Sequence, residues 1–160
     1  MLNYYDNLLP LDETVSMYNS ILTRPFFYGE ADRVDTAPTG LLSPLDSNDP
    51  IYIRLTDILK QKMNLESLQR SYINLFRPGE YPLFHKDGKG TTCLFYINPE
   101  TALDEGGETQ FVINDNITGI VPKPGRLCVF DGLIEHRATS FRTIPRITIA
   151  FKFTESWPSG

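Results

Sequence analysis

Residues 146–153 alternate strictly between apolar side chains and a second, more polar set. The apolar set is Ile147, Ile149, Phe151 and Phe153, and the second set is Arg146, Thr148, Ala150 and Lys152. A period of two is typical of a β-strand, because successive side chains of a strand point to opposite faces of the sheet. This stretch therefore predicts a strand with one face in an apolar core and an arginine on the other face.

Two helical patterns lie in the first part of the chain. The first begins at Asp12 and ends before Pro25, and its apolar stripe is Leu11, Val15, Tyr18, Ile21 and Leu22. The second begins at Asp49-Pro50, where Asp49 or Asn48 is the predicted N-cap. Its apolar stripe is Ile51, Leu55, Ile58, Leu59 and Met63. Apolar residues three and four positions apart are typical of a helix that covers a core with one face.

Short β-patterned segments separated by Gly and Pro turns make up most of the remaining chain. We expect strands within residues 1–10, 25–29, 68–76, 91–98, 108–113, 126–130 and 146–153, and a long surface loop over residues 30–50. Helices followed by such strands predict a mainly β fold with flanking helices, in which the helices pack on a β-sandwich or barrel. Loops of this length are often lids or binding segments, and a simple connection is the alternative.

Composition and charge narrow the class of protein. The 160 residues suffice for one domain with a substantial core, and no stretch is apolar enough to span a membrane. The net charge of −5 argues against nonspecific binding to nucleic acid. The first residues are acidic and polar rather than basic and apolar, so we expect a cytoplasmic protein. Cys93 and Cys128 lie in apolar runs, and we expect both to be reduced and buried.

The two histidines of the chain and one aspartate form a candidate metal site. His85 and Asp87 are separated by one residue, so on a strand their side chains point to the same face. His136 lies in a later strand-like stretch, and intervening strands can return it to the pair. Two imidazoles and one carboxylate, with open positions opposite, are the ligand set of non-haem Fe(II) oxygenases. Taken alone, a His-x-Asp pair can also be a simple hydrogen-bonded surface contact.

Arg146 points to a second ligand near this site. In a barrel covered by helices, the polar face of strand 146–153 points into a cavity. A buried guanidinium requires an anionic partner, and the strand contains no acidic residue that could supply one. We therefore expect Arg146 to bind the carboxylate of a ligand in a two-pronged geometry.

Together these residues resemble the HxD…H…R signature of the Fe(II)- and 2-oxoglutarate-dependent dioxygenases. The signature is His85-Lys-Asp87, His136 and Arg146-Ile-Thr148. Within that superfamily the chain is similar to the prolyl 4-hydroxylase-like branch, in residues 76–81, 92–98, 105–109 and 124–130. The resemblance covers about residues 68–153 and implies a double-stranded β-helix (jelly-roll) core. The expected organisation is a single domain over 1–160, with helical and strand support in 1–66 and the catalytic core in 67–154.

The resemblance also implies roles for individual residues. The Fe(II) ligands of the catalytic centre would be His85, Asp87 and His136. Arg146 would bind the distal carboxylate of the cosubstrate 2-oxoglutarate, with Tyr96 and Thr148 as hydrogen-bonding helpers. O2 would be the other cosubstrate, and ascorbate an optional auxiliary reductant. Tyr96 has an alternative interpretation, as one more aromatic residue of a β core.

The predicted function is hydroxylation of a C–H bond, in a prolyl residue of a protein or peptide. One alternative is a hydroxylase of a free amino acid, another small metabolite or a nucleobase. Acidity and the absence of a basic stripe with interleaved aromatic residues count against DNA. A second alternative is a catalytically silent metal-binding β-barrel that serves as a binding module. The presence of a complete ligand set together with Arg146 counts against that module.

Overall fold

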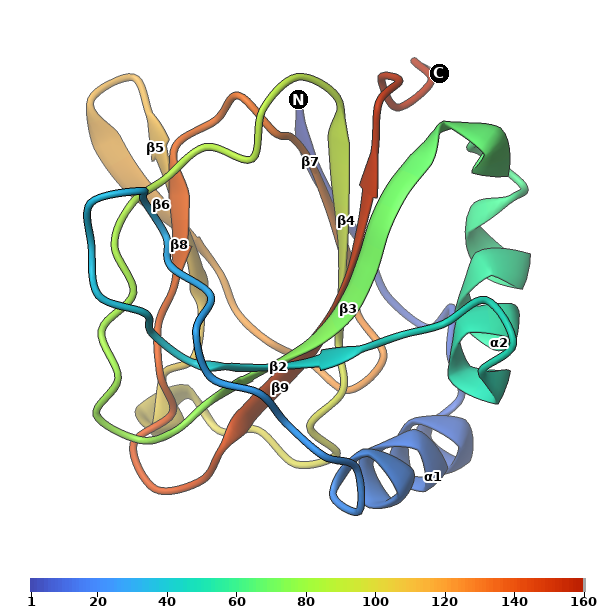
Figure 1. The fold of residues 1–160 in the computed structure, drawn as a ribbon, viewed down its shortest axis with the longest axis horizontal. Coiled ribbons are helices and arrows are strands. Elements are labelled where there is room, and N and C mark those ends of the chain that lie inside the picture. The colour runs from blue at the N-terminus through green and yellow to red at the C-terminus, as the bar shows by residue number, and fades with distance from the viewer. Residues whose placement is uncertain (160) are drawn as a thin grey trace.

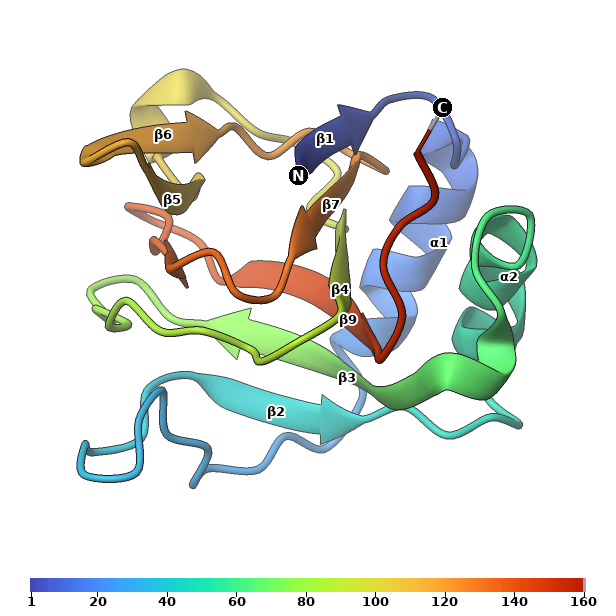
Figure 2. The same ribbon diagram turned by 90° about the horizontal axis from the view of Figure 1, so that it is seen from above.

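Two antiparallel sheets face each other, and two helices cover the outer face of the larger sheet (Figure 1 and Figure 2). The structure is a computed structural model and describes residues 1–159. The strands of the larger sheet follow the order β1-β7-β4-β9-β3-β2, and those of the smaller sheet the order β6-β5-β8. The predicted mainly β class with flanking helices is confirmed.

The elements have the following bounds. The larger sheet consists of β1 (Leu2–Tyr5), β2 (Leu41–Pro44), β3 (Leu68–Phe76), β4 (Thr91–Tyr96), β7 (Leu127–Asp131) and β9 (Arg146–Phe153). The smaller sheet consists of β5 (Thr109–Ile113), β6 (Asn116–Ile120) and β8 (His136–Ala138). The helices are α1 (Leu11–Ile21) and α2 (Pro50–Leu59), and short 3-10 turns lie at Leu65–Ser67 and Leu103–Glu105. Within residues 1–159, no helix has the length and apolar content needed to cross a membrane.

Strand β9 lies between β3 and β4 and distributes its side chains as the alternation predicted. Ile147, Ile149 and Phe151 are fully buried in the core beneath the helices. Arg146 and Thr148 line a cavity on the opposite face, between the two sheets. Burying each large apolar side chain stabilises the fold by roughly 1.5–3 kcal/mol. The helix side therefore anchors β9, and its other face is free to build a site.

Helix α2 begins where the sequence indicates. Pro50 is its first residue, and Asp49 is the N-cap, whose Oδ1 accepts a hydrogen bond of 2.9 Å from the N–H of Ile51. Asp49 also forms an ion pair with Arg24, which follows α1 in the chain. Arg24 follows the end of α1 and Asp49 precedes the first residue of α2, so this ion pair links the two helices.

Helix α1 buries only part of its predicted apolar stripe: Ile21 is buried and Tyr18 packs against the core, but Leu11 and Leu22 are exposed. The buried residues are Thr14, Met17 and Ile21, whereas Leu11 of the predicted stripe is 60% exposed. A threonine can lie in this core because its hydroxyl donates a 3.1 Å hydrogen bond to the carbonyl of Pro10. That bond satisfies the polar group within the helix itself.

Two expectations about the segment between the helices are wrong. Residues 25–29 do not form a strand, since Phe27 makes a single isolated bridge to Leu42. Residues 30–50 are not one continuous loop, because β2 forms within them and pairs with β3. β2 pairs with the edge of β3, and the bridge from Phe27 lies on the far side of β2, so both pairings depend on the larger sheet. The long connection is therefore shorter than predicted and ends at residue 40.

Candidate metal centre

His85 and Asp87 lie on an extended segment that pairs with the edge of the smaller sheet. The segment is extended but not part of a named strand, because it makes one isolated bridge, between His85 and His136. In this bridge the two residues exchange N–H···O hydrogen bonds of 3.0 Å. The N–H of Asp87 donates to the carbonyl of Gly132 at 2.8 Å. Backbone hydrogen bonds thus bring together residues that are far apart in the sequence.

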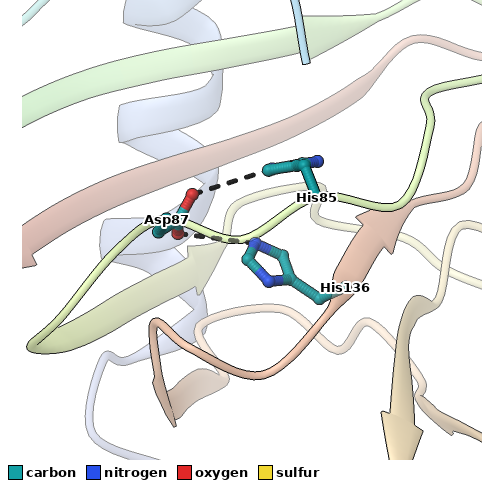
Figure 3. Close-up of side chains that lie close together, drawn as sticks. All are labelled: His85, Asp87 and His136. Carbon is teal, nitrogen blue, oxygen red and sulfur yellow. Dashed lines mark ion pairs between the residues drawn. The ribbon is translucent and has the colours of Figure 1, made fainter. Parts of the chain in front are cut away.

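The three side chains converge on one point (Figure 3). Each offers one potential ligand atom, and these atoms lie within 4.8 Å of one another. The Nε2 atom of His85 lies 3.7 Å from Oδ1 of Asp87, and the Nε2 atom of His136 lies 3.4 Å from Oδ2. The predicted convergence of these three residues is confirmed.

The second nitrogen of each imidazole is held by a backbone carbonyl. Nδ1 of His85 lies 2.9 Å from the carbonyl oxygen of Leu83, and Nδ1 of His136 lies 2.8 Å from that of Ile134. A carbonyl oxygen can only accept a hydrogen bond, so each Nδ1 carries the proton. In a neutral imidazole the Nε2 lone pair then faces Asp87. Two such nitrogen lone pairs and a carboxylate that face one point are a donor set that fits a divalent transition metal.

Asp87 is fixed by partners from two strands of the larger sheet. Its Oδ2 accepts a hydrogen bond of 2.7 Å from the Thr92 hydroxyl, and its Oδ1 accepts one of 2.7 Å from Nζ of Lys152. Burial raises the pKa of the Asp87 carboxyl, but the contacts with His136 and Lys152 outweigh burial and lower the pKa well below its ordinary value. Asp87 is therefore an oriented carboxylate rather than a carboxylic acid.

Arg146 is buried close to this centre and contacts neutral acceptors. Its Nε donates a hydrogen bond of 2.7 Å to the carbonyl of Gly107, and Nη2 donates one of 2.8 Å to Oγ1 of Thr109. Gly107 has a φ of +78°, and a Cβ at this position would overlap the ring of Phe141. This turn therefore requires glycine, and glycine allows its carbonyl to approach the guanidinium. Burial lowers the pKa of Arg146 from its ordinary value, although an arginine remains charged.

One cavity connects the three potential metal ligands to the arginine. Its volume is about 260 Å³, and Thr148, Thr109 and Phe130 are among the residues that line it. The Oγ1 atom of Thr148 is buried and has no hydrogen-bond partner within residues 1–159. A buried hydroxyl without a partner is costly, so Thr148 marks a position where a polar ligand atom would be stabilised.

Comparisons with known proteins identify the fold. No protein-family model and no curated protein matches this sequence. A Pseudomonas putida prolyl-4-hydroxylase superposes with a TM-score of 0.77 at 17% identity, over 95% of this chain and 91% of that one. The viral collagen prolyl hydroxylase of Paramecium Bursaria Chlorella virus-1, as a 2-oxoglutarate complex, superposes with a TM-score of 0.71 at 16% identity, over 94% of each chain. A Trichoplax adhaerens prolyl hydroxylase, in complex with a peptide fragment of the hypoxia inducible factor oxygen degradation domain, gives 0.70 at 14% identity, over 96% and 83%.

This chain has the fold of the 2-oxoglutarate- and Fe(II)-dependent oxygenases. The likeness to prolyl hydroxylases extends over nearly the whole chain, and the predicted double-stranded β-helix is confirmed. In this oxygenase fold the metal-ligand candidates lie where the segment before β4 meets β8. Arg146 begins β9, beside them in the same cavity.

The oxygenase fold also contains a site residue that the sequence analysis did not assign. Thr109, the first residue of β5, lines the cavity and accepts the hydrogen bond from Arg146. The hydroxyl of Tyr96 lies 2.6 Å from Oγ1 of Thr109 and is buried behind it. Tyr96 is therefore placed to orient Thr109 rather than to contact a ligand directly. Thr109 lies in residues 105–109, which carry the family resemblance, but the HxD…H…R signature does not include it.

Proposed function

We propose that this protein is an Fe(II)- and 2-oxoglutarate-dependent dioxygenase that hydroxylates a C–H bond, in a prolyl residue of a protein or peptide. In this proposal His85, Asp87 and His136 ligate Fe(II) and form the catalytic centre. The observation that carries the proposal is the shared cavity. It joins this donor set to Arg146, a buried guanidinium that has no carboxylate partner within residues 1–159.

2-Oxoglutarate has two carboxylates, and the cavity offers a place for each. The distal carboxylate would accept hydrogen bonds from Arg146 and from the Thr148 hydroxyl, which otherwise has no partner. The keto-acid end would lie against the metal ligands. A bound carboxylate would offset the cost of burying Arg146, because charge-assisted hydrogen bonds replace the water that the guanidinium has lost.

The chemistry that Fe(II) supplies when bound is oxidation by O2, so that R–H, 2-oxoglutarate and O2 give R–OH, succinate and CO2. The residues of the chain orient the reacting groups. Thr92 and Lys152 hold Asp87, and backbone carbonyls hold both histidines. Apolar side chains that line the cavity, such as Leu94, limit the entry of water.

The prolyl acceptor is supported by likeness in fold. Prolyl hydroxylases are among the structures that superpose on nearly the whole chain, and one of them holds a peptide. We also propose that the protein acts in the cytoplasm. Both cysteines are buried as free thiols, as predicted, which fits a reducing compartment.

Two measurements test the proposed function. Purified protein with Fe(II), 2-oxoglutarate and ascorbate should release succinate, and the His136→Ala variant should not. Peptide and metabolite pools are then incubated with the active enzyme and searched by mass spectrometry for products that gain one oxygen atom. A hydroxylated prolyl peptide supports the proposal, whereas a hydroxylated free metabolite or nucleobase corrects the substrate. Absence of succinate release under every condition would contradict the dioxygenase.

A further inference from the structure

Asp32 is a largely buried carboxylate in the connection that precedes β2, outside the set of metal-ligand candidates. Its side chain is 11% exposed and lines the cavity. Oδ2 accepts hydrogen bonds from the Thr39 hydroxyl at 2.9 Å and from the N–H of Leu83 at 2.8 Å. Oδ1 lies 3.8 Å from Nδ1 of His85. Because burying a carboxylate is costly without such partners, these contacts fix Asp32 in one place.

Asp32 supports the peptide that orients His85. The N–H of Leu83 donates to Asp32, and the carbonyl of the same residue accepts from Nδ1 of His85. The Asp32 carboxylate therefore fixes the Leu83 peptide, and this peptide in turn fixes the His85 imidazole. Its negative charge also favours a proton on the nearby Nδ1, and that tautomer leaves Nε2 free to face the metal.

The two histidines of the centre differ in what else fixes them. The ring of His136 is buried and packs against Phe111 and Phe130, with ring centroids 6.0 Å and 4.6 Å away. The ring of His85 is 22% exposed, and its aromatic neighbour within residues 1–159 is His136 itself. Aromatic packing therefore helps to orient His136, whereas the orientation of His85 depends mainly on its polar contact with the Leu83 carbonyl.

Two further contacts join the 30–39 connection to the same region. Nε of Arg33 donates to the carbonyl of Phe84 at 3.2 Å. Glu30 forms an ion pair of 2.7 Å with Arg70 on β3. The connection is thus attached both to the sheet and to the segment that bears His85, and Asp32 contributes its contact with the N–H of Leu83.

We propose that Asp32 is the positioning residue for His85. It acts through the Leu83 peptide and through its charge beside Nδ1, and it makes the 30–39 connection a structural part of the metal centre. This inference rests on the proposed metal centre. Carboxylates placed behind a metal-ligating histidine commonly raise its basicity and fix its ring orientation.

The test is Co(II) binding by the metal-free protein, followed by calorimetry and by the d–d absorption of the bound ion. Asp32→Ala should weaken Co(II) binding about ten- to a hundredfold and alter the d–d bands, because one imidazole is no longer held in place. Asp32→Asn should lose less affinity, since its amide oxygen can still accept from Leu83. Asp35→Ala, an exposed position of the same connection, is the matched control and should bind like the wild type.

The outcomes separate this inference from the metal centre itself. If Asp32 has a purely structural role, the metal-free Asp32→Ala protein should melt at a lower temperature while its Co(II) affinity and spectrum stay unchanged. That result would overturn the inference. If Asp32→Ala does not fold, Asp32→Asn decides by the same two readouts. If Asp32→Ala binds Co(II) as tightly as the wild type while His85→Ala does not bind it, this inference fails but the metal centre stands. Equal binding by wild type and His85→Ala would overturn the metal centre and this inference together.

Discussion

Arg146 is buried in the cavity, yet its hydrogen bonds go to a backbone carbonyl and a threonine hydroxyl. Asp87, by contrast, has a donor on each of its oxygens. At the scale of residues, the site therefore combines polar groups that are already fixed with groups that still lack a partner. The unpaired hydroxyl of Thr148 belongs to the second kind. Such groups indicate where a ligand carboxylate would bind, because a ligand would satisfy them.

Replacement of Arg146 tests this assignment. Arg146→Ala should weaken 2-oxoglutarate binding by roughly ten- to a hundredfold, because a charge-assisted pair contributes about 1.5–3 kcal/mol. Arg146→Lys should lie between wild type and alanine, since lysine keeps the charge but loses the two-pronged geometry. The measurement is a titration of 2-oxoglutarate against the Co(II)-loaded proteins. Wild-type affinity in Arg146→Ala would show that the cosubstrate binds elsewhere.

At the scale of elements, the junction of the two helices depends on one side chain. Asp49 caps α2 and also forms an ion pair with Arg24, so a single carboxylate satisfies a helix terminus and a guanidinium. The hydrogen bonds from Arg24 lower the pKa of Asp49 below its ordinary value, and burial opposes them. The connection of residues 30–40 is the other element that defines the site, because it borders the cavity.

Asp49→Ala should destabilise the protein by about 2 kcal/mol near neutral pH, through loss of the cap and of the ion pair. The folded-state pKa of Asp49 lies below the unfolded value of 3.8. Its stabilising effect is therefore complete above pH 3.8 and is lost as the pH falls through the folded-state pKa. Urea unfolding of wild type and variant should accordingly show a difference that shrinks in acid. An Asp49→Ala difference that stays constant down to the lowest pH would exclude the ion pair as its source, and Asp35→Ala serves as the exposed control.

The 30–40 connection is predicted to act as a lid over the cavity. Val34 is fully exposed on it, and an apolar side chain in that position would gain from contact with an acceptor molecule. Replacing residues 34–38 by a shorter Gly-Ser link, with Asp32, Arg33 and Thr39 retained, should raise the KM for the hydroxyl acceptor. The KM for 2-oxoglutarate and the Co(II) affinity should not change. Unaltered acceptor kinetics would reduce this stretch to a simple connection.

At the scale of the whole molecule, the larger apolar core and the site lie on opposite faces of the larger sheet, and a smaller apolar cluster packs around the site between the sheets. The core beneath the helices contains the fully buried side chains Ile73, Phe95, Ile149 and Phe151. The cavity and its charged groups lie on the other face, between the sheets. The fold therefore does not depend on the metal to bury its main core, and a change at the metal centre should affect binding more than folding.

This separation predicts how the metal affects thermal stability. Co(II) at about a hundred times its Kd should stabilise the wild type by about 2.7 kcal/mol. For a domain of this size that corresponds to a rise in Tm of roughly 5–10 °C. Asp87→Ala should unfold cooperatively but show no rise in Tm with Co(II). Loss of cooperative unfolding in the metal-free variant would mean that Asp87 is needed for the fold itself.

Local spacing was enough to predict much of this protein. The alternation in residues 146–153 predicted β9 and placed Arg146 on the cavity face, because a strand has a period of two whatever surrounds it. The His-x-Asp spacing predicted convergence of His85 and Asp87, and the remaining histidine was the natural third member. The Asp49-Pro50 pair likewise predicted the start of α2, since a cap and a first-turn proline act within a few residues.

The remaining features depended on contacts between distant parts of the chain. Thr109 became a site residue because β5 brings it to Arg146, and Asp32 because the connection before β2 folds back onto Leu83. The buried face of α1 and the pairing of β2 were decided in the same way, by which surfaces the assembled larger sheet left free. A hydrogen bond across tens of residues leaves no periodic signal in either partner. The sequence therefore determined which residues could act, and the tertiary structure decided which of them meet.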